Sequence, residues 1–148
     1  MIVMAPKDEN ELRHMLKTAM ETDQPVSIRY PRGKGAGVPL DEQPEKIPLG
    51  RAEILQDGED LAIVAIGSTV LPALAAAQDL LNEGIRTTVI NARFVKPLDG
   101  DLICRVASTC RRLITVEENV LTGGFGSAVL ELLQDKGITE IQIGRANV

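Results

Sequence analysis

Residues 61–91 read LAIVAIGSTVLPALAAAQDLLNEGIRTTVIN, and this stretch decides the fold class of the chain. The runs Leu61–Ile66 and Thr87–Asn91 have the length of buried strands, and the segment between them predicts a helix. Pro72 falls in the first turn of that helix and Gly84 lies just past its end, the usual asymmetry of helix ends. This order predicts two parallel strands joined by a right-handed crossover.

The alternation of strands and helices continues toward the end of the chain. Either Ser68 or Thr69 can cap the first helix, and Asp99 opens the next one. The elements expected after that helix are a strand at Leu113–Val116, a helix at Phe125–Leu133 closed by Gly137, and a strand at Ile138–Ile143.

A further strand precedes the opening stretch. Ala52–Leu55 and Leu61–Ile66 flank the pair Asp57-Gly58, which suits a tight turn between antiparallel strands. The predicted fold class is therefore α/β, a three-layer α/β/α domain with a mostly parallel sheet covered on both faces. Its first strand is the expected antiparallel edge.

The first 33 residues predict a smaller unit. Ile2–Ala5 and Val26–Tyr30 read as strands, and the helix between them begins at a capping box of Asp8 and Glu11. The apolar residues of this helix recur at helical spacing on one face, namely Leu12, Met15, Leu16, Ala19 and Met20. One strand–helix–strand unit is too small to close a core, so we expect it to belong to a larger sheet and the chain to begin inside a domain.

A segment without periodicity separates the two units. Residues 34–48 are rich in Gly, Pro and charged side chains and read as a linker. The expected organisation is a partial domain at 1–33, a linker at 34–48 and a second domain at 49–148.

Composition narrows the class of partner. The net charge of −5 and the presence of one Tyr, two Phe and no Trp argue against nucleic-acid binding. Apolar runs such as Leu61–Ile66 are far shorter than the roughly 20 residues of a membrane span, so we expect a soluble, cytoplasmic protein without a membrane partner. Cys104 and Cys110 lack the spacing and the companion His of a zinc site, so we expect two reduced thiols and no bound metal.

Ligands of such sheets bind at the carboxyl ends of the strands. Those ends are Gly67-Ser68, Asn91-Ala92-Arg93 and Glu117-Glu118-Asn119. The last one precedes a glycine-rich turn, Thr122–Ser127, whose amides could hold an anion at the start of a helix. Because carboxylates lie beside this turn and no Lys follows its glycines, we expect the acids to bond neighbouring amides and no nucleotide to bind.

Basic residues offer the other candidate sites. Arg32 follows a strand in Tyr30–Gly33, and its guanidinium can bind a phosphate or carboxylate through two parallel hydrogen bonds, with a solvated turn arginine as the alternative. The single histidine, His14, lies off the apolar face of its helix, where we expect a solvated position. For Arg93 and Lys96 we expect a structural turn or a subunit contact. No residues form a catalytic triad, and we expect no catalytic residue in this chain.

Five motifs follow one another in the chain: MAPKDENE (4–11), RYPRG (29–33), NARFVKPLD (91–99), VEENV (116–120) and GGFGS (123–127). In this order and spacing they resemble the 1-deoxy-D-xylulose-5-phosphate synthases. Transketolases and the beta chains of ketoacid dehydrogenases share the fold and differ at these motifs. The resemblance covers nearly the whole chain and departs from the family pattern after Gly144, so we expect the last part of the family's carboxy-terminal domain to be missing.

The resemblance implies an enzyme that condenses pyruvate with glyceraldehyde 3-phosphate, releases CO₂ and feeds isoprenoid, thiamine and pyridoxal synthesis. It implies thiamine diphosphate and Mg²⁺ as cofactors, bound by regions that precede this chain, so the chain alone is expected to be inactive. Residues 1–33 would end a pyrimidine-binding domain, and residues 49–148 would be a transketolase-type carboxy-terminal domain that supports a homodimer. Arg32 would bind the phosphate of the aldehyde substrate, with Arg29 as a second candidate.

Two alternatives remain open at this point. The chain could be a non-catalytic dimerisation or assembly module for a partner that carries the active site. It could also be the carboxy-terminal part of a transketolase or of a ketoacid dehydrogenase beta chain, which would keep the cofactor and change the acceptor substrate.

Overall fold

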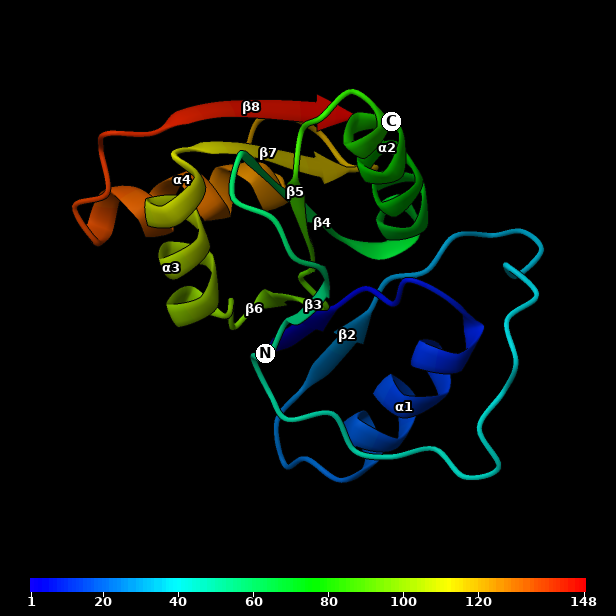
Figure 1. Ribbon diagram of the computed structural model, residues 1–148. Helices are drawn as coiled ribbons and strands as arrows, with labels where there is room; N and C mark the ends of the chain where they lie inside the picture. The colour runs from blue at the N-terminus through cyan, green and yellow to red at the C-terminus, as the bar shows by residue number, and fades with distance from the viewer.

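Residues 61–91 fold as expected in the computed structural model, which describes residues 1–148 (Figure 1). It forms β4 (Leu61–Ala65), the short 3-10 turn η1 (Gly67–Thr69), α2 (Val70–Asn82) and β5 (Thr87–Asn91). β4 and β5 pair in parallel along their whole length. The predicted strand–helix–strand unit is confirmed.

The larger sheet has five strands in the order β3-β5-β4-β7-β8. Its remaining members are β3 (Glu53–Gln56), β7 (Arg112–Glu117) and β8 (Gln142–Asn147). All neighbours are parallel except β3, which runs antiparallel to β5 at the edge. The α/β class, the mostly parallel sheet and the antiparallel first strand are confirmed, although the last strand begins later than the predicted Ile138.

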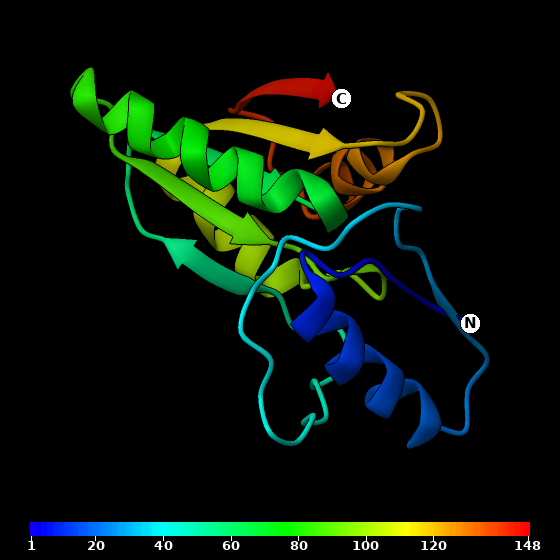
Figure 2. The same ribbon diagram turned by 90° about the vertical axis from the view of Figure 1, so that its right-hand side faces the viewer.

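Helices cover both faces of this sheet (Figures 1 and 2). Along β4, Ile63 and Ala65 pack with α2, whereas Ala62 and Val64 face the opposite cluster. That cluster contains buried residues of α3 (Gly100–Cys110) and α4 (Phe125–Asp135). Because successive side chains of a strand point to opposite faces, a strand that is apolar throughout can serve two cores. The structure therefore has the three predicted layers.

The predicted hairpin between the first two strands of this domain is wrong. β3 pairs with β5, and β4 lies on the other side of β5. The connection crosses the start of β5 at Gly58, where a Cβ atom would lie 2.5 Å from the carbonyl carbon of Arg86. β4 does not pair with β3 at the edge because it is buried on both faces from Ala62 to Ala65, which suits the centre of a parallel sheet.

A second sheet holds the first unit. β1 (Ile2–Met4) pairs in parallel with β2 (Val26–Ile28), and the helix between them is α1 (Glu9–Met20). The third strand of this sheet is β6 (Phe94–Lys96), which runs antiparallel to β1. The sequence predicted only a loop there. The side chain of Phe94 is fully buried beside Ile2, Met4 and Met15, so a residue far along the chain completes the core of the first unit.

The buried face of α1 also differs from the prediction. Leu16 and Met20 are exposed, with exposed fractions of 49% and 87%. The buried residues are Glu11, Met15 and Thr18. Two polar side chains therefore occupy the inner face of this helix, and each has a hydrogen-bonded partner described below.

The segment 34–48 contains no helix or strand, as expected of a linker, and runs alongside α1 (Figures 1 and 2). Its backbone is bonded to that helix at several points. The buried amide of Ile47, for example, donates to the Thr18 hydroxyl at 2.8 Å. Among the helices, none has the length and apolar composition that a membrane crossing requires.

Three helix caps were predicted, and two are confirmed. Asp8 accepts from the amide of Glu11 at 2.7 Å, and Asp99 accepts from the amide of Leu102 at 3.1 Å. Neither Ser68 nor Thr69 caps α2 with its side chain. A 3-10 turn precedes that helix, and the Thr69 hydroxyl instead donates toward the carbonyls of Ile66 and Val116.

Candidate functional site

The carboxyl ends of both sheets meet at the junction of the two units. The backbone amide of Arg29, just past β2, donates to Met4, and its guanidinium lies 3.4 Å from the carboxylate of Glu118, just past β7. Glu118 also accepts a hydrogen bond from the hydroxyl of Ser68, just past β4. Two of the strand ends predicted to bind ligands, Ser68 after β4 and Glu118 after β7, thus lie together beside the loop that leads from Arg29 to Arg32.

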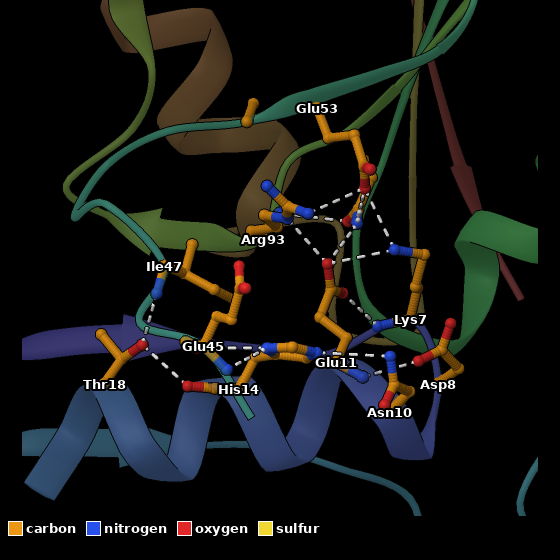
Figure 3. Close-up of polar contacts among 12 residues, drawn as sticks. Lys7, Asp8, Asn10, Glu11, His14, Thr18, Glu45, Ile47, Glu53 and Arg93 are labelled. Carbon is orange, nitrogen blue, oxygen red and sulfur yellow. Dashed lines mark hydrogen bonds and ion pairs between the residues drawn. The ribbon is translucent and has the colours of Figure 1, made fainter. Parts of the chain in front are cut away.

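A buried carboxylate lies at the centre of this junction (Figure 3). Glu11, with an exposed fraction of 3%, accepts hydrogen bonds from Arg93 Nε at 2.7 Å, Asn91 Nδ2 at 2.8 Å and the amide of Lys7 at 2.8 Å. The capping box is therefore only half correct, because Glu11 reaches the amide of Lys7 and not that of Asp8. The carboxylate joins α1 to the end of β5.

Glu53 on β3 completes the charge balance of this network. It accepts from Arg93 Nη2 at 2.9 Å and from Lys7 Nζ at 3.0 Å. Burial would raise the pKa of Glu53, but the Lys7 ammonium and the Arg93 guanidinium outweigh it and hold that pKa below its usual value. Burial likewise opposes the charge on Lys7, and the facing carboxylates of Glu11 and Glu53 raise its pKa above the usual value. Two acids and two bases thus neutralise one another, as buried charges require.

The backbone of Arg93 adopts a conformation that is rare for a residue with a side chain. Its φ of 59° lies in the left-handed region, which is costly for a residue with a Cβ atom. The side chain is held by Glu11 and Glu53, and the next residue enters β6. The structural role predicted for Arg93 is confirmed, and Lys96 lies at the end of the same strand.

Arg32 lies on the exposed loop that follows β2, and its side chain makes no hydrogen bond or ion pair. Its neighbours Tyr30, Pro31 and Lys34 line a pocket of about 460 Å³, and Arg32 itself lies beside the lining. The other walls include the acids Asp8 and Glu9 of the first unit, Ser68 of η1 and the start of α2. Arg29, the second candidate, is already paired with Glu118. Of the two arginines, Arg32 is the one whose guanidinium is available to an anion.

The glycine-rich turn has the predicted internal partner. The carboxylate of Glu117, with an exposed fraction of 2%, accepts from the amides of Phe125 and Gly126, both at 2.8 Å. A Cβ atom on Gly124 would lie 2.5 Å from the same carboxylate. The interpretation that an acid bonds these amides is confirmed for Glu117, which occupies two amides of the first turn of α4 and places a negative charge where a phosphate would bind.

Residues 50–148 match the model of the family described as transketolase, C-terminal domain. The chain belongs to the transketolase C-terminal domain family. The matched residues include the whole five-stranded sheet with its three helices.

Similarity to curated relatives extends through the first unit as well. A 1-deoxy-D-xylulose-5-phosphate synthase of Geobacter sulfurreducens is 60% identical over 148 residues, which cover all of this chain and 23% of that protein. The corresponding enzyme of Syntrophus aciditrophicus is 55% identical over the same share of both chains. The resemblance drawn from the five motifs is confirmed. The chain spans about a quarter of the length of these relatives.

A solved structure extends the comparison to three dimensions. The transketolase C-terminal domain of this chain and its first unit align together with a split-gene transketolase, described as an inactive β4 tetramer. The TM-score is 0.84 and the identity 32%, over 99% of this chain and 48% of that chain. The transketolase-like architecture is therefore shared by both units.

The prediction for the single histidine is wrong. His14 is largely enclosed, with 15% of its side chain exposed, because the segment 34–48 folds back over α1. Its Nδ1 accepts from the amide of Glu45 at 2.7 Å, so Nε2 carries the proton and donates to Asp41 at 2.9 Å. Hydrogen bonds from Asn10 and then His14 hold the pKa of Asp41 below its usual value. His14 therefore anchors the segment to the helix.

The side chains present do not fit the cofactors that the resemblance implies. No group of three or more His, Cys, Asp or Glu side chains is arranged to hold a metal ion. At the start of α4, the amides of Phe125 and Gly126 are bonded to Glu117, whose carboxylate would repel a diphosphate there. Cys104 and Cys110 are unpaired thiols, and burial raises the pKa of each. What this junction can do chemically is bind an anion at Arg32 and hold the two units in register.

Sequence reasoning missed the network around Glu11. The signals were an asparagine directly after the apolar pair Val89-Ile90 at the end of a strand and a carboxylate on the same helix face as Met15. Each residue has a simple local interpretation, since Asn91 ends a strand and Glu11 belongs to a predicted helix cap. Only the docking of the first unit on the carboxyl edge of the larger sheet brings Asn91 and Glu11 together.

Proposed function

We propose that this chain is the carboxy-terminal part of a 1-deoxy-D-xylulose-5-phosphate synthase and supplies the loop that binds the aldehyde substrate. The reaction would join pyruvate to glyceraldehyde 3-phosphate with loss of CO₂, giving a precursor for isoprenoids, thiamine and pyridoxal. The observation that carries this proposal is 60% identity over all 148 residues to a synthase of that name.

The organisation proposed for the chain follows the same comparison. Residues 1–33 would end a pyrimidine-binding domain, 34–48 would link it to the next, and 49–148 would be the carboxy-terminal domain. The upstream portion of the same enzyme would be its partner and would hold thiamine diphosphate and Mg²⁺, since the side chains present here do not fit them. We further propose a cytoplasmic homodimer that has no activity without the upstream portion.

Arg32 would bind the phosphate of glyceraldehyde 3-phosphate. The guanidinium carries no internal carboxylate partner, in contrast to Arg29. The pocket beside it is lined by Lys7 and Lys34 as well as by Asp8 and Glu9, and the positive charge of Arg32 is not cancelled by a carboxylate of its own. Two parallel charge-assisted hydrogen bonds would fix the phosphate in direction as well as in distance. Binding this remote group would orient the aldehyde carbonyl for attack without contact between Arg32 and the reacting carbon.

The test uses a chimera in which this chain replaces the matching 148 residues of the Geobacter sulfurreducens synthase. Arg32→Ala is expected to raise the KM for glyceraldehyde 3-phosphate by roughly 10- to 100-fold, since hydrogen bonds to charged groups are worth about 1.5–3 kcal/mol. The KM for pyruvate should stay within about twofold, because the proposed contact involves only the aldehyde. Steady-state kinetics with each substrate varied in turn give both values.

Two further variants sharpen this comparison. Arg105→Ala removes an exposed arginine on α3, away from the loop, and should leave both KM values unchanged. Arg29→Ala should affect the aldehyde less than Arg32→Ala does, because its guanidinium already contacts Glu118. An equal change in the KM for both substrates in Arg32→Ala would remove the proposed role of Arg32.

A second candidate function is an assembly module without a role in substrate binding. The observation that favours it is the similarity to a split-gene transketolase described as an inactive β4 tetramer. This alternative predicts that the chimera forms product equally well with Arg32 and with Ala at that position. The phosphate-binding proposal predicts the opposite.

A further inference from the structure

One side chain of α1 ties down the segment that follows Arg32. Glu9, the first residue of the helix, accepts hydrogen bonds from three consecutive amides of that segment. The distances are 2.9 Å to Ala36, 2.6 Å to Gly37 and 3.1 Å to Val38. No cation pairs with Glu9, so backbone amides are its only partners beyond its own residue.

The glycines of this segment permit the close approach. A Cβ atom on Gly35 would lie 2.7 Å from Cδ of Glu9, and that carboxylate cannot swing away without losing its three amides. Gly37 has a φ of +80°, a conformation that residues with a Cβ atom rarely adopt. The segment is thus shaped to wrap one carboxylate.

The loop that carries Arg32 is anchored at both ends. Before it, the amide of Arg29 donates to the carbonyl of Met4 at 2.9 Å. After it, the amide of Ala36 is held by Glu9. Only six residues, 30–35, lie between these two anchors, and none of them is in a helix or strand. Releasing the second anchor would free the end of the loop that follows Arg32, where Lys34, Gly35 and Ala36 line the pocket.

Electrostatics argue that Glu9 acts through the loop and does not touch an anion itself. The amide of its own residue and those of Gly37, Ala36 and Val38 hold the pKa of Glu9 below its usual value. Glu9 lines the pocket beside Arg32, where a free ionised carboxylate would repel a phosphate. Its oxygens are instead bonded to the amides of residues 36–38, and Glu9 also lies at the positive amino end of α1, so both surroundings offset its charge.

We propose that Glu9 is a positioning residue for phosphate binding, because its carboxylate holds residues 36–38 and thereby fixes the loop that presents Arg32. This inference rests on the proposed function of Arg32. It adds a residue that contacts neither substrate nor cofactor and that determines how well the loop is ordered before the phosphate arrives.

The test compares Glu9→Ala and Glu9→Gln with Glu42→Gln, an exposed glutamate of the same segment that makes no ion pair, all in the chimera. Glu9→Ala is expected to speed hydrogen exchange of the amides of residues 36–38 at least about tenfold. It should raise the KM for glyceraldehyde 3-phosphate by about tenfold with little change in kcat or in the KM for pyruvate. Glu9→Gln keeps one accepting oxygen and should give intermediate values, and Glu42→Gln should match the parent.

Two outcomes would overturn the inference. Unchanged exchange at residues 36–38 in Glu9→Ala would mean that the carboxylate does not hold the loop. Faster exchange without a change in the aldehyde KM, while Arg32→Ala still raises it, would leave Arg32 in its role and remove Glu9. If Arg32→Ala itself has no effect on the aldehyde, the proposed function fails instead. Should Glu9→Ala not fold, Glu9→Gln supports the same comparisons.

Discussion

At the scale of single residues, acidic side chains that lie near the start of a helix in the sequence accept hydrogen bonds from backbone amides of that helix. Asp8 and Asp99 cap their helices, and Glu117 bonds the amides at the start of α4. These contacts are predictable because a few residues of chain fix the geometry of each one. The role of Glu9 was not predictable in this way, since its partners lie 27 to 29 residues away in a segment without periodicity.

The burial of Glu117 gives a prediction at this scale. Glu117→Ala would leave the amides of Phe125 and Gly126 without partners inside the protein, which should lower the free energy of unfolding by about 3 kcal/mol. Urea denaturation of the chain measures this change. The control is Glu131→Ala on the exposed face of α4, which should change the free energy by less than about 0.5 kcal/mol. Equal midpoints for the two variants would contradict the account of this turn.

At the scale of elements, prediction succeeded where periodicity and length carry the information. α2, α3, α4, β5 and β7 lie close to their expected positions. Three features depend on contacts across the molecule and were missed, namely the pairing of β3 with β5, the strand β6, and the buried face of α1. β6 has only three residues, so no alternation marks it, and it forms because β1 offers an edge.

The ion pair between Glu11 and Arg93 gives the prediction at this scale. Glu11→Ala should lower the free energy of unfolding by about 3 kcal/mol, because it leaves the Arg93 and Lys7 charges short of a partner in a nearly buried site. Arg93→Ala alone should also destabilise the chain. A double-mutant cycle should give a coupling energy of about 2 kcal/mol between the two side chains. A coupling energy near zero would mean that the two units dock without this pair.

At the scale of the whole molecule, the two units share one boundary. A strand from the second unit completes the first sheet, and the Glu11 network joins α1, β3 and the end of β5. The exposed loop with Arg32 lies where the carboxyl ends of both sheets meet, and Glu9 anchors it from α1. The general position of the site was predictable from strand order, since ligands bind at that edge of such sheets. The docking of the first unit on the carboxyl edge of the larger sheet was not predictable, because it depends on contacts between segments that are distant in the chain.

The central claim is that this chain serves deoxyxylulose phosphate synthesis, and product analysis of the chimera tests it most directly. With thiamine diphosphate and Mg²⁺ supplied, the account predicts 1-deoxy-D-xylulose 5-phosphate by mass spectrometry from pyruvate and glyceraldehyde 3-phosphate. It predicts no transfer when a ketose phosphate replaces pyruvate as the donor. A folded chimera that forms no product, or one that uses the ketose phosphate donor in place of pyruvate, would contradict the claim.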